Sequence, residues 1–441
     1  EGRARGEQGL YVSFAETEAE TREIAASHGW GLDDLSIMEL VAADDILEGD
    51  AITMFHPSEV ELNRTTRAIL DRAERLRPAR VVIDSLSEVR LLAESSLRYR
   101  RQVLALKQHL ARQGTTTLLL DDRSTTPDAH LQSVAHGVLS LYHLSPQYGA
   151  ERRRLRVLKL RGRTYRGGYH DFSIRRGGLE VYPRLVAAEH HEDFPRDPFS
   201  SGDPNLDALL GGGVSPGTSL LLQGPAGTGK STLAVQFAVA AARRGARATL
   251  FLFDEGIATV MTRSQGMGLG LRELLEADLV GVRQVDPAEL TPGQFSHEVR
   301  REVEERGAKI VVIDTLNGYQ HAMVEEQFLL VHLHELLAYL AQRGVLTVLV
   351  LAQHGIAGPG LISAVDTSYL ADTVLLFQHR EVRGELRQVL STVKKRDGRH
   401  ERTVRELLFG PGGLTVGRVV SEQVPAAEAV RTGTEPSAGP A

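Results

Sequence analysis

The sequence contains no cysteine, and that absence removes several kinds of chemistry. Without thiols the chain forms no disulfide, no thiolate zinc site and no cysteine nucleophile, which fits a reducing compartment. No window approaches the ~18 to 20 consecutive apolar residues of a membrane span, and the start shows neither a secretory nor a transit-peptide pattern. We therefore expect a cytoplasmic protein with no membrane partner.

A large excess of charge of one sign is also missing, because the formal net charge is −6 over 441 residues. A broad basic surface is not expected, and a nucleic-acid partner is therefore disfavoured. The short basic run at 152–156 is interpreted as a solvated hairpin. His190 and His191 are interpreted as part of a solvated segment, since no third metal ligand follows at a suitable spacing.

The sequence does contain an internal repeat, in which the same series of motifs occurs twice. The stretch RGEQGLYVSFAET at 5–17 matches RGARATLFLFDEG at 244–256, and ARVVIDSL at 79–86 matches AKIVVIDTL at 308–316. Repeats of this length are whole domains. In both copies continuous apolar, β-branched runs alternate with helical stretches, as expected for strands buried on both faces. This pattern predicts a doubly wound, mainly parallel α/β sheet in each copy.

Changes in composition mark the domain boundaries. We expect a first domain at 1–186 and a linker at 187–200, where proline and charge replace the apolar periodicity. A second domain is expected at 201–420. The last stretch, 421–441, is rich in alanine, proline, glutamate and threonine and is expected to be a disordered tail.

One phosphate-binding motif interrupts the symmetry of the two copies. The sequence LLLQGPAGTGKSTL at 220–233 fills the pattern GxxxxGK[ST], between a strand-like run at 218–223 and a helix-like run at 232–242. Backbone N–H groups of such a loop point at phosphates, and the helix adds its positive end. Lys230 is expected on the β- and γ-phosphates and Ser231 on Mg²⁺. The expected ATP-binding residues are Gly224, Pro225, Ala226, Gly227, Thr228, Gly229, Lys230, Ser231 and Thr232.

The first copy contains no such loop. Gly6 matches Gly245, an offset of 239, so Glu1 matches Ala240, ten residues beyond Lys230. The first copy thus begins after the point where its own loop would stand, and the chain opens with glutamate rather than methionine. We expect a first domain that is either truncated or degenerate.

Polar residues follow three further buried runs. Asp314 ends KIVVID and is the expected second Mg²⁺ ligand. Asp254 and Glu255 end TLFLFDE, at the edge where ligands bind in open α/β sheets, and one of them is the expected general base. The alternative for this pair is an acidic helix cap. Gln353 and His354 end VLTVLVLAQH and are candidates to sense the γ-phosphate.

The order GPAGTGKS, LFDE, VVIDT, VLAQH, SYLADTVLLF and VKKRDGRHERTVREL resembles the KaiC family of tandem RecA-like ATPases, over nearly the whole chain. The resemblance implies an α/β fold with two tandem RecA-like P-loop domains and mainly parallel, helix-flanked sheets. It also implies a homohexamer of two stacked rings, with ATP between neighbouring subunits. By motif, Lys394 and Arg396 match the residues that reach the γ-phosphate of the next subunit, as Lys159 and Arg161 do in the first domain. Cations placed there stabilise developing phosphoryl charge.

Two departures from the family pattern bear on activity. The first copy reads Ala15 and Glu16 where family members carry two acids. The Ser-Thr pair that is phosphorylated in timekeeping members falls on Ser368 and Tyr369, so the serine is present and the threonine is replaced. Ser368 is therefore a candidate phosphosite, and a two-site phosphorylation cycle is not expected.

These features predict a KaiC-like signalling ATPase that hydrolyses ATP with Mg²⁺ at subunit interfaces. Serine/threonine autokinase activity is a further candidate, with Glu255 or Asp254 as base toward water or the Ser368 hydroxyl. Two alternatives stay open: a RecA-like DNA-dependent ATPase and a nucleotide-dependent ring scaffold. Protein partners would dock on the first domain or on the tail at 421–441.

Overall fold

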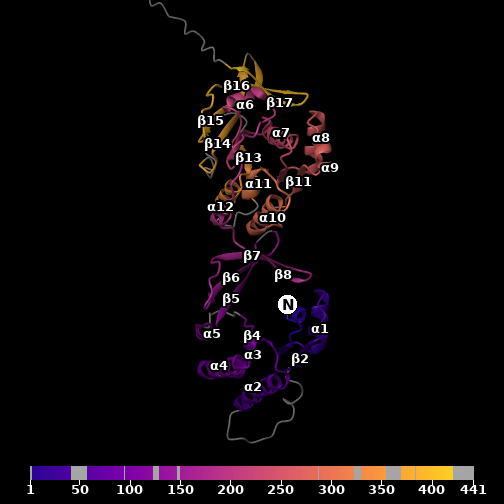
Figure 1. Cartoon of the computed structure of the whole chain (residues 1–441), viewed down its shortest axis with the longest axis vertical. Helices are drawn as coiled ribbons and strands as arrows, with labels where there is room; N and C mark the ends of the chain where they lie inside the picture. The colour runs from indigo at the N-terminus through magenta and orange to yellow at the C-terminus, as the bar shows by residue number, and fades with distance from the viewer. Residues whose placement is uncertain are drawn as a thin grey trace, which may run out of the picture. The chain divides into compact units, whose positions relative to one another are not determined.

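The computed structural model divides the chain into two compact units (Figure 1). Unit 1 comprises Glu1–Tyr142 with Arg153–Val181, and unit 2 comprises His143–Arg152 with Tyr182–Ala441. The residues that the structure describes are 2–40, 57–93, 95–122, 129–146, 149–286, 288–321, 329–353, 369–382 and 384–420.

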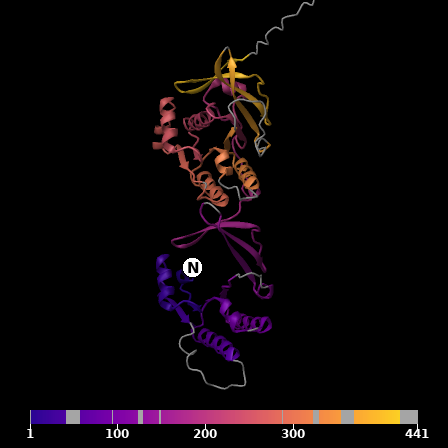
Figure 2. The same ribbon diagram turned by 180° about the vertical axis from the view of Figure 1, so that it is seen from behind.

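Unit 1 contains two four-stranded sheets. The parallel one has the order β2 (Leu35–Glu39), β1 (Gly9–Ser13), β3 (Arg80–Asp84), β4 (Thr116–Leu119). The other has the order β5 (Gly137–Leu144), β6 (Arg152–Leu160), β7 (Tyr169–Arg175), β8 (Gly178–Tyr182). The helices are η1 (Arg3–Arg5), α1 (Glu18–Ser27), α2 (Pro57–Leu76), α3 (Leu86–Leu92), α4 (Ser96–Arg112) and α5 (Ala129–Val134). Helix α2 packs beside α4, as the view from behind in Figure 2 also shows.

Unit 2 contains a nine-stranded sheet with the order β11-β10-β12-β13-β9-β14-β15-β16-β17. From β11 to β14 neighbouring strands pair in parallel, and from β14 to β17 they pair antiparallel. The strands are β9 (Ser219–Pro225), β10 (Ala248–Leu252), β11 (Val280–Gln284), β12 (Ile310–Asp314), β13 (Leu346–Gln353), β14 (Thr373–Val382), β15 (Glu385–Lys395), β16 (Arg405–Gly410) and β17 (Gly413–Val419).

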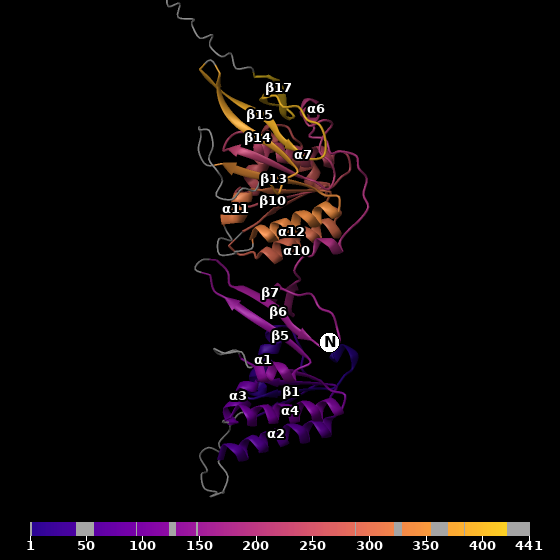
Figure 3. The same ribbon diagram turned by 90° about the vertical axis from the view of Figure 1, so that its left-hand side faces the viewer.

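Helices cover both faces of the parallel part of this sheet. Ile310 and Val312 of β12 belong to the core that contains α7, whereas Val311 and Ile313 belong to the core that contains α10 and α12. Helices α10 and α12 lie together in Figure 3. Burial on both faces explains the continuous apolar run of this strand. The helices are α6 (Pro204–Leu209), α7 (Lys230–Ala242), α8 (Ile257–Gly266), α9 (Leu271–Glu276), α10 (Pro292–Glu304), α11 (Leu316–His321) and α12 (Leu329–Gln342), with η2 (Ala187–Glu189) before them.

One strand distinguishes the sheet of unit 2 from the sheets of unit 1. Strand β9 bonds to β13 on one side and to β14 on the other, so it joins the parallel half to the antiparallel half. In unit 1 the corresponding strands, β4 and β5, belong to separate sheets, and no described residue forms a strand between them. The strand that leads into the phosphate-loop motif therefore also makes the sheet of unit 2 continuous.

Unit 1 lacks, within its described residues, the cover that α7 gives to one face in unit 2. In β3 buried and half-buried residues alternate, whereas every residue of β12 is buried. Leu118 in β4 and Leu139 in β5 are 51% and 59% exposed. Their counterparts in the repeat, Val348 and Leu375, are 0% exposed in the core that contains α7. Among the described residues, the two copies thus share the order of their first four parallel strands, and only the copy in unit 2 covers both faces of its sheet.

Two residues that the sequence suggested were solvated are shielded from water within unit 2, whereas the side chain of His191 is exposed. Residue His190, in the expected linker 187–200, stacks edge-on against Tyr339 with ring centroids 5.1 Å apart. Arg152 is buried, and its Nη1 donates a hydrogen bond to the carbonyl oxygen of Leu290 at 2.7 Å. The solvated interpretation of both residues is wrong. Over the described ranges, no cluster of three or more His, Cys, Asp or Glu side chains could hold a metal ion.

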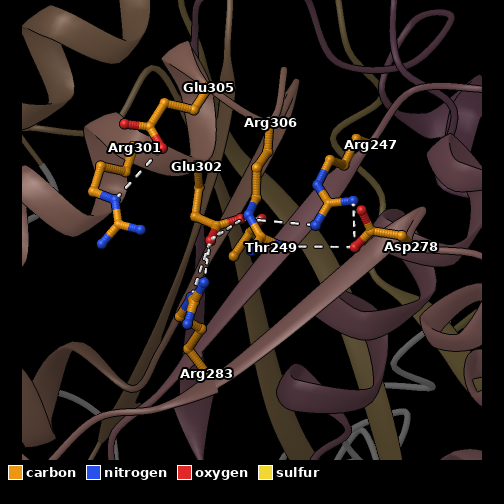
Figure 4. Close-up of polar contacts among 8 residues, drawn as sticks. All are labelled: Arg247, Thr249, Asp278, Arg283, Arg301, Glu302, Glu305 and Arg306. Carbon is orange, nitrogen blue, oxygen red and sulfur yellow. Dashed lines mark hydrogen bonds and ion pairs between the residues drawn. The ribbon is translucent and has the colours of Figure 1, made fainter.

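A buried ion-pair network ties α10 to the edge of the sheet (Figure 4). Glu302 is buried and accepts hydrogen bonds from Arg283 at 2.7 and 3.0 Å and from Thr249 at 3.1 Å. Arg247, also buried, pairs with Asp278 at 2.9 Å and lies 3.9 Å from Glu302. The network therefore links one helix to strands β10 and β11 through a carboxylate held away from water.

Candidate nucleotide-binding site

The loop after β9 turns sharply into α7. Gly227 and Gly229 have φ angles of 76° and 98°, in the left-handed region that glycine favours. A Cβ on Gly224 would lie 2.3 Å from the carbonyl oxygen of Phe377, so only glycine lets the loop pass this close to β14. Helix α7 begins at Lys230 with no acidic residue in its first turn. Its first amides are therefore suited to a phosphate.

Lys230 folds back over its own loop. Its Nζ donates a hydrogen bond to the carbonyl oxygen of Pro225 at 2.6 Å, and Thr228 Oγ1 donates to the same oxygen at 2.8 Å. Lys230 is only 6% exposed. Burial lowers its pKa to about 8, and the charge of Asp314 offsets part of that effect. The loop thus holds a partly desolvated cation, which a bound anion would stabilise.

Ser231 and Asp314 bring two oxygen ligands together. Ser231 is the second residue of α7, and its Oγ donates a hydrogen bond to Asp314 Oδ1 at 3.1 Å, at the end of β12. Burial raises the pKa of Asp314 to about 6, although the bond from Ser231 acts in the opposite direction. The structure therefore brings Ser231 and Asp314 together, the two residues that the sequence motifs singled out as Mg²⁺ ligands.

The two acids after β10 have different partners. Asp254 Oδ2 accepts a hydrogen bond from Thr315 Oγ1. Glu255 Oε1 accepts one from Arg263 Nη1 at 2.5 Å, with side chains that are 23% and 27% exposed. The negative charge of Glu255 contributes to the raised pKa of Asp314. Glu255 is therefore the acid whose charge reaches the Ser231–Asp314 pair.

Gln353 lies at the same sheet edge as the loop. It is the last residue of β13 and pairs in register with Pro225. Asn317 holds this end of β13, because its side chain accepts a hydrogen bond from the Ala352 amide at 2.7 Å and donates one to the Ala352 carbonyl at 3.0 Å. His354 and Ser368 lie outside the described residues.

Lys394 and Arg396 lie near the opposite end of β9. Arg396 pairs with Asp372 at 3.2 Å, and the other oxygen of that carboxylate accepts a hydrogen bond from Ser219, the first residue of β9. Lys394 Nζ donates to the carbonyl oxygen of Ala371 at 2.7 Å. At ~3.3 Å per residue, β9 separates its first and last residues by about 20 Å. The structure thus does not bring these two cations to the loop of their own chain.

The same arrangement occurs in unit 1. Arg161 Nη2 donates a hydrogen bond to the carbonyl oxygen of Ser133 at 3.0 Å, and Lys159 Nζ donates to that of Gln132 at 2.8 Å. In unit 2, Arg396 Nη2 donates to the carbonyl oxygen of Tyr369 at 2.9 Å. Both copies therefore anchor the equivalent cations to the segment before the same strand.

Comparison with known proteins decides the family. A family model described as KaiC, an ATPase, matches residues 1–186 and residues 199–420. The chain belongs to the KaiC family of ATPases. The circadian clock oscillator protein KaiC of Picosynechococcus sp. is 26% identical over 418 residues, which cover 92% of this chain and 79% of that protein. KaiC of Synechococcus elongatus is 26% identical with the same shares, and KaiC of Prochlorococcus marinus is 26% identical over 92% and 82% of the two chains.

The match to KaiC proteins confirms two of the expectations from the sequence. The family resemblance is confirmed, and so is the fold of tandem α/β domains with mainly parallel, helix-flanked sheets. Within the part of the chain that the structure describes, no helix is both long and apolar enough to cross a membrane.

Three residues around the KaiC-family motifs were missed by sequence reasoning. Thr315 and Asn317 follow the expected metal ligand and bind Asp254 and the end of β13; Thr315 ends the motif VVIDT, which assigns it no role, and Asn317 lies in none of the quoted motifs. Arg263 is eight residues from Glu255. Two turns of α8 place Arg263 on the same side of the helix as Glu255, which lies just before the helix begins. A search for basic residues two helical turns after the acid would have found Arg263.

Proposed function

We propose that this KaiC-family chain binds ATP with Mg²⁺ at residues 224–232 and hydrolyses it to ADP and phosphate. The observation that carries the proposal is the meeting of Lys230 with the Ser231–Asp314 pair at the loop after β9. This arrangement offers amides, a cation and oxygen ligands to a triphosphate.

The oxygen donors at this edge fit Mg²⁺. Ser231 Oγ and Asp314 Oδ1 lie 3.1 Å apart, and Mg²⁺ prefers carboxylate, hydroxyl, phosphate and water oxygens. In the proposal these two residues hold the ion. When bound there, Mg²⁺ neutralises negative charge on the phosphate oxygens.

Glu255 is the proposed general base. Its carboxylate accepts a proton from the attacking water as the oxygen–phosphorus bond forms, and the bond from the γ-phosphorus to the bridging oxygen of ADP breaks. Lys230 contacts the β- and γ-phosphates. Gln353, at the same edge, contacts the γ-phosphate, whereas Asp254 is held by Thr315 and supports the turn.

We further propose that Lys394 and Arg396 act on the loop of a neighbouring subunit in a homohexamer. Their place near the far end of β9, about 20 Å from their own loop, supports action between chains. A cation that stabilises the developing charge on the transferred phosphoryl group accounts for ~10³ to 10⁵ in rate in other enzymes of this kind. Assembly would then control turnover.

Phosphate release by matched variants tests the main proposal. Lys230→Ala is expected to lower phosphate release at least ~100-fold, because the variant loses the cation on the transferred group. Lys309, exposed immediately before β12, provides the control, and Lys309→Ala is expected to retain the wild-type rate. Equal rates for wild type and Lys230→Ala would refute the proposal.

Transfer of the γ-phosphoryl group to Ser368 is the second proposed activity. One observation favours it: Arg396 Nη2 donates a hydrogen bond to the carbonyl oxygen of Tyr369, so the residue after Ser368 is anchored to a proposed interfacial cation. Label from γ-labelled ATP is expected on the wild type and on Tyr369→Phe, and not on Ser368→Ala. Label that persists in Ser368→Ala would assign the acceptor elsewhere.

A further inference from the structure

We propose that Arg263 is a positioning residue, which fixes the carboxylate of Glu255 so that it can accept the proton of the attacking water. The inference rests on the function proposed above and adds a residue that the motifs do not include. It follows from the place of Glu255 in the fold, from the environment of the guanidinium group and from a comparison of the two copies.

The backbone alone does not fix Glu255. The residue lies in the turn between β10, which ends at Leu252, and α8, which begins at Ile257. A side chain in such a turn has several rotamers available, and a base must be held near the reacting atoms. The bond from Arg263 Nη1, at 2.5 Å, selects one of these arrangements. Because Arg263 lies in the last turn of α8, it has a rigid support.

The environment of the Arg263 guanidinium group indicates a functional residue. A charge-assisted bond between two largely buried side chains is strong and directional. Arg263 Nη2 is also buried and has no hydrogen-bond partner within the described residues. Buried polar groups without partners are costly and are found at functional sites. The charge of Arg263 also lowers the pKa of Asp314, so this guanidinium belongs to the same site as the metal ligands.

The first copy of the repeat provides an internal comparison. At the offset of 239, Glu16 matches Glu255 and Ile24 matches Arg263. Ile24 is exposed, and Glu16 Oε2 instead accepts a hydrogen bond from Ser13 at 3.3 Å. The second copy thus has an arginine paired with its glutamate, and the first copy has an exposed apolar residue at the equivalent position.

A double-mutant cycle on the full chain tests the inference. Arg263→Gln is expected to lower kcat for phosphate release ~10²-fold, as a misplaced catalytic group does, and to change the Kd for a non-hydrolysable Mg·ATP analogue less than ~3-fold. Arg263→Lys retains the charge and is expected to recover about tenfold of that loss. Arg272→Gln, on an exposed position of α9, is the control and should match the wild type. Thermal unfolding of each variant checks that it is folded.

The decisive comparison is with Glu255→Gln. If Arg263 acts through Glu255, adding Arg263→Gln to Glu255→Gln lowers kcat no further. Losses that multiply in the double variant, or a loss of analogue binding in place of kcat, would overturn the inference and leave the proposed ATPase intact. If wild type and Lys230→Ala release phosphate equally, the proposed function fails and this inference fails with it.

Discussion

Lys230 and Pro225, at the two ends of the phosphate loop, are joined by a 2.6 Å hydrogen bond from Nζ to the carbonyl oxygen. The bond holds a cation whose pKa burial lowers to about 8. The folded pKa lies below the ordinary value of Lys, so the charged form is disfavoured in the folded state. The stability from this group is present at pH values above the unfolded pKa and is lost as the pH falls through about 8.

Lys230→Met is therefore expected to stabilise the nucleotide-free protein at pH 7, by about 1 to 3 kcal/mol, while it abolishes turnover. Urea unfolding at pH 7 measures the effect. The gain should shrink at high pH, where Lys230 is neutral in both states. If Lys230→Met is less stable than the wild type at pH 7, the buried charge of Lys230 does not lower the free energy of unfolding.

Asp314 gives a second pH dependence, which affects the binding of Mg²⁺ rather than folding stability. Burial raises its pKa to about 6, so below that pH the folded protein carries a proton where Mg²⁺ would bind. The affinity for a Mg·ATP analogue is expected to fall about tenfold per pH unit below pH 6 because ion and proton compete. Asp314→Asn should bind the Mg·ATP analogue weakly. The pH dependence that its affinity retains should come from protonation of the nucleotide itself. Equal slopes for the two proteins, measured by calorimetry, would contradict the assignment.

Glu302 is expected to dominate the stability of the edge of unit 2. Glu302→Ala removes the buried acceptor of Arg283 and Thr249 and leaves Asp278 as the acid paired with Arg247, so it should destabilise the protein by about 1 to 3 kcal/mol. Glu305→Ala is the control, because Glu305 is exposed and pairs with exposed Arg301 at 3.6 Å, so it should change stability little. Urea midpoints compare the two. A small effect of Glu302→Ala would mean that water replaces the lost acceptor.

Mixing two inactive variants tests whether the site is shared between chains. Lys230→Ala removes the loop cation, and Arg396→Ala removes the proposed cation of the neighbour. In a random mixed ring about one interface in four has both residues, so about a quarter of the wild-type rate should return. Neither variant alone should release phosphate at this rate. Mixtures that stay inactive after subunit exchange, verified by mass, would argue against a shared site.

Much of the site could be predicted from sequence because its residues follow local rules. The loop pattern fixes the turn from β9 into α7, and an acid at the end of a buried run places Asp314 beside Ser231. These residues meet because β12 and β9, separated by β13, are parallel strands of one sheet and end at the same edge. The tandem α/β fold followed for the same reason, from apolar runs repeated in both halves.

The other features of the site and the fold depend on contacts between residues that no local sequence pattern encodes. Arg263 meets Glu255 because helix α8 returns it to that turn, and Arg152 is buried with its Nη1 bonded to the carbonyl oxygen of Leu290, 138 residues away in sequence. His190 looked solvated because its neighbours are charged, yet Tyr339 covers it. Partners that are distant in sequence decide burial at such positions, and composition alone does not reveal them.

Strand β9 has a mechanical consequence. It is the seam between two differently built halves of one sheet, and its last residues are the first of the phosphate loop. A force that separates β13 from β14 would therefore displace the start of the phosphate loop. A ligand bound in the loop would oppose that separation. The strand that keeps the sheet continuous therefore also sets the position of Gly224 and Pro225, where the proposed nucleotide loop begins.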